Sequence, residues 1–129
     1  MSQTFPEHEL VLKTIAMPKD TNFNGDIFGG WVVSQMDLGG CVAARKLTHH
    51  RVVTAAIESL SFIKPVEVGD TLCCYAKLIH QGRTSMKYHL AAFVKRQGFG
   101  EREKVTQAEF TFVAINDKGM PTPIQAQKD

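Results

Sequence analysis

The sequence contains no apolar run that approaches the roughly 20 residues needed to cross a bilayer. Its first residues, MSQTFPEHEL, have neither a basic start nor an apolar core, so we expect no signal peptide. The sequence also lacks a large excess of charge of one sign, because its 15 Lys and Arg nearly balance its 13 Asp and Glu. Nucleic-acid-binding domains, by contrast, usually carry a pronounced basic face. We therefore predict a cytoplasmic protein that binds neither membrane nor nucleic acid.

Cysteine is scarce. The three cysteines, Cys41, Cys73 and Cys74, are odd in number and form no CxxC motif, which favours reduced thiols. No two of the five histidines have a helical i, i+4 spacing, so we predict no metal site. A GxSxG motif, a P-loop and a GxGxxG motif are absent too.

The periodicity of apolar residues predicts one helix and five strands. A loop rich in Asn, Asp and Gly, residues 18–30, precedes a helix over 30–47 with a broad apolar face. The strands are expected at 10–17, 52–63, 71–80, 84–95 and 104–115, with a bulge near Glu58–Ser59 where the alternation changes phase. Short connections between the last four strands indicate an antiparallel sheet. We therefore predict an α+β fold with one long helix wrapped by about five strands, and 129 residues fit a single domain.

Two features of the predicted helix require an explanation. The pair Gly39–Gly40 costs helix propensity, about 1 kcal/mol per glycine, which suggests that something packs very close there. Asp37 lies on the same stripe as Val33, Gly40 and Ala44, where an unpaired carboxylate is costly to bury. Asp37 is then a nucleophile or general base, or else an aspartate at the edge of the stripe that reaches solvent. The pattern favours neither.

Gly29 and Gly30 lie where the helix begins. Amides at a helix start lack intrahelical acceptors and can stabilise a developing oxyanion. The pattern alone favours the simpler interpretation, that these glycines only permit a tight turn. Basic residues at predicted strand ends could bind phosphates, although for any single one the pattern favours a solvated rim: Arg51, Lys64, Arg83, Lys95 and Arg96.

The segment AMPKDTNFNGDIFGGWVVSQMDLGG resembles the signature of hotdog-fold acyl-CoA thioesterases, most closely the bacterial YciA type. The similarity continues in RVVTAAIESLSFIKPVEVGDTLCCYAKL, GRTS and AEFTFVAIN, and covers roughly residues 10–116. The segment RQGFGEREK is shorter than is usual in that family. The residues that match the signature are Met17–Pro18, Asn22, Gly25, Gly29–Gly30 and Met36–Asp37.

The resemblance implies a single hotdog domain over residues 1–129 that hydrolyses acyl-CoA to a fatty acid and CoA. It implies that Asp37 is the nucleophile or general base, that an amide of Gly29 or Gly30 polarises the thioester carbonyl, and that Asn22 helps to set the site. It implies no cofactor other than the CoA carried by the substrate. The candidates for holding CoA are Arg51, Lys64, Arg83, Ser85 and Lys95.

The distance between Gly29 and Asp37 predicts a shared active site. Eight residues of helix span roughly 12 Å, whereas a carboxylate and an oxyanion donor must both lie about 3 Å from one reacting group. Two helices that face each other across a twofold axis satisfy this condition, so we predict a homodimer with two mixed sites. The resemblance suggests a hexamer, a trimer of dimers, as the higher assembly.

Two other functions fit the same fold. The chemistry of a hotdog hydratase or dehydratase usually resembles an acid that works together with a histidine. The helix 30–47 contains no histidine. A non-catalytic acyl-CoA-binding module needs no acid, and Asp37 on the apolar stripe argues against it.

Overall fold

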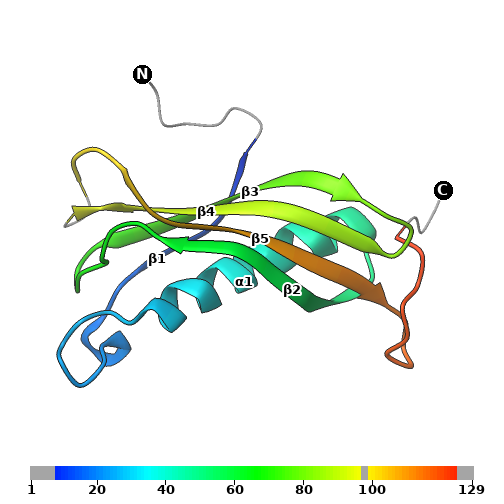
Figure 1. The fold of residues 1–129 in the computed structure, drawn as a ribbon, viewed down its shortest axis with the longest axis horizontal. Helices are drawn as coiled ribbons and strands as arrows, with labels where there is room; N and C mark the ends of the chain where they lie inside the picture. Colours follow the sequence, from blue (N-terminus) through cyan, green and yellow to red (C-terminus); the bar gives the residue numbers. More distant parts are fainter. Residues whose placement is uncertain (1–7, 97–98, 125–129) are drawn as a thin grey trace.

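The computed structural model describes residues 8–96 and 99–124 and has one helix packed against an antiparallel sheet (Figure 1). The predicted α+β fold and the predicted hotdog arrangement are confirmed. The elements are β1 (Glu9–Ile15), η1 (Pro18–Asp20), α1 (Gly29–Thr48), β2 (Arg51–Phe62), β3 (Thr71–Gln81), β4 (Ser85–Lys95) and β5 (Glu103–Ile115).

The strands lie in the order β1-β3-β4-β5-β2, and all neighbours are antiparallel. β2 does not pair with β3, which follows it in the chain. It pairs instead with β5, the last strand. β1 and β2 are therefore the two edge strands. As a result, β2 has one free edge along which another strand can be added.

The helix α1 begins after Phe28, which has extended backbone, and ends at His49, which has a φ of 62°. The N–H of His49 donates to the carbonyl of Arg45 at 2.8 Å and closes the last turn. Arg45 and Lys46 place positive charge near the negative end of the helix dipole. The chain enters β2 two residues after this cap, so α1 and β2 run in opposite directions side by side.

The close packing expected at Gly39–Gly40 is confirmed. A Cβ on Gly39 would lie 2.7 Å from Val11 Cγ2, and one on Gly40 would lie 2.6 Å from the ring of Phe112. Neither distance leaves room for a side chain. The glycine pair therefore allows the middle of α1 to lie directly against β1 and the central strands.

The bulge expected near Glu58–Ser59 is also confirmed. Glu58 lies opposite Glu109 and Ser61 opposite Gln107, so β2 advances three residues while β5 advances two. Ser59 has a φ of 56°, an uncommon conformation for a side-chain-bearing residue. A second irregularity, between Thr54 and Ala56, is not apparent from the sequence.

We expect Gly40→Ala to lower the free energy of unfolding by about 1–2 kcal/mol. Overpacking a buried contact costs about 1–3 kcal/mol, and the higher helix propensity of alanine offsets about 1 kcal/mol of that cost. Urea denaturation at one protein concentration measures the change. The same substitution in a Phe112→Leu background should cost less, because the ring that the new Cβ meets is gone. Equal costs in the two backgrounds would contradict the close contact.

Candidate active site

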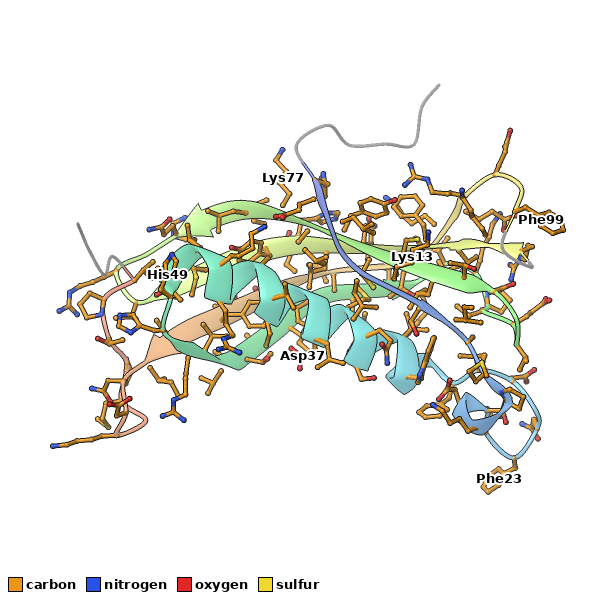
Figure 2. The ribbon with its side chains drawn as sticks, turned by 180° about the vertical axis from the view of Figure 1, so that it is seen from behind. Lys13, Phe23, Asp37, His49, Lys77 and Phe99 are labelled. Carbon is orange, nitrogen blue, oxygen red and sulfur yellow. The ribbon has the colours of Figure 1, made fainter. Side chains whose placement is uncertain are left out.

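Asp37 lies near the middle of α1 (Figure 2), half-buried between the buried residues Met36 and Gly40 and the strand β2. The hydroxyl Oγ1 of Thr54 donates to Asp37 Oδ1 at 2.6 Å. Within the described residues, no hydrogen bond reaches Oδ2 of the same carboxylate. Asp37 is thus at the edge of the apolar stripe, oriented through one oxygen and open at the other.

Thr54 is the residue of this site that sequence reasoning missed. It lies on β2 with Val52, whose side chain packs against the core from the same strand. The alternation of side chains along β2 can show that the Thr54 hydroxyl faces the helix. It cannot show that the partner of this hydroxyl is Asp37, which is 17 residues away in the chain. Only the tertiary contact shows that Thr54 holds the carboxylate.

Cys41 follows Asp37 by about one helical turn and is the nearby thiol. Burial raises the pKa of the Cys41 thiol, and the negative charge of Asp37 raises this pKa further. A hydrogen bond with Thr54 acts in the opposite direction and is a smaller influence. The thiol therefore stays protonated at neutral pH, so Cys41 is not a competing nucleophile.

A groove of about 430 Å³ lies at the start of α1, apart from Asp37. A Cβ on Gly29 would lie 2.7 Å from the ring of Phe62, so the aromatic ring rests directly on the helix start. Gly30, by contrast, is exposed. The walls of the groove are mainly apolar with one cation, and they include Ile27, Val32, Phe62, Lys64 and Val66.

The loop before α1 is shaped by Asn22. Its side-chain oxygen Oδ1 accepts hydrogen bonds from the backbone N–H groups of Asn24 at 2.9 Å and Asp26 at 3.1 Å. Gly25 has a φ of 82°, a conformation that glycine adopts without strain. Figure 2 shows Phe23 of this loop at one end of the molecule, well apart from Asp37. The loop and the carboxylate therefore do not meet within one chain.

The continuous helix also separates Asp37 from the two glycines. Asp37 follows Gly29 by eight positions within α1, which makes the separation about 12 Å along the helix axis. The sequence-predicted residues Asp37, Gly29, Gly30 and Asn22 thus form two groups in a single chain. The carboxylate with Thr54 is one group, and the helix start with its loop is the other.

The five candidates for holding CoA do not gather in one place either. Lys64 lines the groove beside Gly29. Arg51, Arg83 and Ser85 lie at the other end of the sheet, where Arg51 donates to the carbonyl of Asn116 at 2.9 Å. Lys95 lies opposite Thr71 on the face of the sheet turned away from α1.

Apolar side chains are exposed around the free edge of β2. Leu38 and Val42 on α1 are 57% and 51% exposed, and Val53 and Phe62 on β2 are 44% and 57% exposed. An exposed apolar face along an unpaired strand edge is typical of an interface between protein chains. Among residues 8–96 and 99–124, no group of three or more His, Cys, Asp or Glu side chains is arranged to hold a metal ion, and no helix there is both long and apolar enough to cross a bilayer.

The fold and this site define a class of protein. Residues 24–100 match the model of the thioesterase superfamily, and the chain belongs to that superfamily. It is 48% identical over 125 residues to the acyl-CoA thioester hydrolase YciA of Salmonella typhimurium, a match that covers 95% of this chain and 94% of the relative. YciA of Escherichia coli is 46% identical, with 95% of each chain covered. The resemblance found in the sequence is thereby confirmed.

Two solved structures show the same fold. A hexameric thioesterase from Yersinia pestis superimposes with a TM-score of 0.87 at 47% identity, covering 92% of this chain and 97% of that one. A hexameric hotdog-fold thioesterase of Campylobacter jejuni gives a TM-score of 0.84 at 41% identity, covering 91% and 90%.

We expect the charge of Asp37 to control the reactivity of Cys41. Asp37→Asn removes a negative charge that raises the pKa of the thiol, so the Cys41 thiolate should form at lower pH. Alkylation of Cys41 by iodoacetamide, followed by peptide mass spectrometry from pH 7 to 10, should shift to lower pH in this variant. Asp26→Asn, at an exposed position in the loop, is the charge-matched control. An identical pH profile in all three proteins would show that Asp37 and Cys41 do not interact.

Proposed function

We propose that this protein hydrolyses acyl-CoA thioesters to the free acid and CoA. The observation that carries the proposal is the Asp37 carboxylate, held by the Thr54 hydroxyl at 2.6 Å and open at its second oxygen. The relatives that support it are acyl-CoA thioester hydrolases at 46–48% identity across nearly the whole chain. Their likeness supports the substrate class, and the geometry supports Asp37 as the acting group.

The chemistry requires an ionised carboxylate. As a general base, Asp37 takes a proton from water while the water oxygen attacks the thioester carbon, and the carbonyl oxygen becomes an oxyanion. The C–S bond then breaks, and the CoA thiolate receives the proton. As a nucleophile, Asp37 attacks the same carbon with Oδ2, the C–S bond breaks and CoA leaves as a thiolate that takes up a proton, and water then hydrolyses the mixed anhydride to the free acid and the Asp37 carboxylate. In both cases Thr54 fixes Oδ1 and thereby aims Oδ2.

The oxyanion donors come from a second copy of the chain. The first amides of α1, at Gly29 and Gly30, have no acceptor within the helix and lie at its positive end. Antiparallel pairing of two β2 edges across a twofold axis brings the helix start of one chain beside Asp37 of its partner, and covers the exposed side chains of Leu38 and Val53. Relatives of known structure are hexameric, and we propose a trimer of such dimers.

The same symmetry gathers the cations that hold CoA. Lys64 lies in the groove at the start of α1, and Arg51, Arg83 and Ser85 lie at the opposite end of the sheet. Antiparallel pairing of β2 places that opposite end of one chain next to the groove of the other. Phosphate groups of CoA then meet basic side chains from both chains, which serve as charge-assisted hydrogen-bond donors.

The remaining features complete the proposal. One domain spans residues 1–129 and needs no cofactor beyond the CoA of its substrate. We place the protein in the cytoplasm, because the thiols of Cys41, Cys73 and Cys74 are free, as is usual in a reducing compartment.

A thiol-release assay with acyl-CoAs of increasing chain length, run beside hydration of an enoyl-CoA, tests the reaction. Hydration without thiol release would replace hydrolysis by the hydratase alternative.

We expect Asp37→Asn to abolish most thiol release while the melting temperature stays close to wild type. Thr54→Val should lower kcat about 10- to 100-fold, because a hydrogen bond to a charged group contributes about 1.5–3 kcal/mol. Thr54→Ser keeps the hydroxyl and should retain most activity. Steady-state kinetics should show the loss in kcat rather than in KM. Equal kcat for the valine and serine variants would remove Thr54 from the mechanism.

Complementation tests the shared site. Asp37→Asn and Gly30→Pro each inactivate one of the two groups, so either homodimer alone should have little activity. Mixed under conditions that exchange subunits, heterodimers should regain one working site of two, because one of the two sites then combines a wild-type carboxylate with a wild-type helix start. Heterodimers verified by differential tags provide the measurement. Mixing two differently tagged Asp37→Asn preparations is the control, and the absence of recovery in verified heterodimers would refute the shared site.

A further inference from the structure

A second hollow, which we call the outer hollow, lies on the face of the sheet turned away from α1. It measures about 380 Å³ and has a floor formed by Thr71, Cys73 and Tyr75 of β3. Its walls carry the cations Lys13, Lys95 and Arg102. Figure 2 shows Lys13 on β1, toward the end of the sheet where the β4–β5 connection carries Phe99.

Strand alternation separates this hollow from the catalytic carboxylate. Successive side chains of a strand point to opposite faces, and Leu72 and Cys74 are buried in the core against α1. Thr71, Cys73 and Tyr75 therefore point to the other face. The strand pairing places Lys13 opposite Cys73 and Lys95 opposite Thr71, so the two lysines flank β3 from either side.

Arg102 is fixed over the hollow by aromatic side chains. Its guanidinium carbon lies 5.0 Å from the ring centroid of Tyr75 and 5.0 Å from that of Phe93. The guanidinium also donates to the hydroxyl of Tyr75. A side chain held in this way has already lost much of its rotational freedom, so a ligand that it binds incurs less ordering cost.

The three cations have no acidic partner in the part of the chain that the structure describes. No carboxylate lines the hollow, and no ion pair joins Lys13, Lys95 or Arg102 to an acidic side chain among those residues. Other cations of the sheet are paired: Lys87, farther along β4, contacts Glu58 at 2.9 Å, and Arg96, beside Lys95, contacts Asp70. Three like charges around one concave surface repel one another and attract an anion.

We propose that the outer hollow binds a phosphate-bearing small molecule at a site separate from the catalytic centre. The guanidinium of Arg102 offers several N–H donors in a planar fork that matches phosphate oxygens, while the two lysines act as point charges. Three positive charges suit the multiple negative charges of a phosphate ester or a diphosphate. Lys95, on this face of the sheet, then serves this site rather than the groove beside Gly29.

Isothermal titration of the full-length protein with inorganic diphosphate tests the proposal. The wild type should bind, and Arg102→Gln and Lys13→Gln should each weaken binding by about tenfold or more, since each removes a charge-assisted contact. Lys118→Gln makes the same charge change at an exposed position in the turn after β5 and should leave binding unchanged. Absence of diphosphate binding, or equal binding by Arg102→Gln, would overturn the site.

Kinetics with acyl-CoA then identify the source of the phosphate. If the site is separate, KM for acyl-CoA in Arg102→Gln should stay within about twofold of wild type. A rise in KM that parallels the loss of diphosphate affinity would make the hollow part of the substrate path and overturn its independence. Arg102→Lys guards against misfolding of the glutamine variant. It keeps the charge but not the planar fork, so it should fold, with an unchanged melting temperature, and bind diphosphate more weakly than wild type.

Discussion

The middle of α1 lies so close to the sheet that Gly39 and Gly40 have no room for a side chain. This contact brings the helix backbone against Val11 of one edge strand and against Phe112 near the other side of the sheet. The position of every other residue on α1 follows from it, because an α-helix is rigid over its length. Asp37 is thereby held beside Thr54, and Gly29 beneath the ring of Phe62.

The same rigidity of α1 explains why the two groups of proposed site residues lie apart in one chain. A straight helix cannot fold back to bring its start to its own middle, so the carboxylate and the first amides remain about 12 Å apart in one chain. The free edge of β2 and the exposed side chains beside it offer a way to bring them together with a second copy. Exposed apolar side chains beside β2 are unfavourable in water in an isolated chain. In the proposed dimer the same side chains form the interface that completes the catalytic site.

The two faces of the sheet have opposite chemical characters. The face toward α1 is aliphatic and aromatic, with Leu90, Phe110 and Phe112 fully buried. The opposite face carries the ion pair of Lys87 with Glu58 and the cations of the outer hollow. Since alternate residues of each strand face opposite ways, one set of strands can support both a catalytic interface and an anion site without conflict.

Local patterns in the sequence determined the helix, five strands, the bulge at Glu58–Ser59, the close packing at Gly39–Gly40 and the place of Asp37 on the apolar stripe of the helix. These features depend on residues that are neighbours in the chain, so periodicity reveals them. Tertiary structure alone decided that β2 crosses to β5, that Thr54 holds Asp37, and that Arg102 lies over Tyr75. Each of these depends on side chains or strands brought together from distant parts of the chain, and no local period records which distant partner a residue will meet.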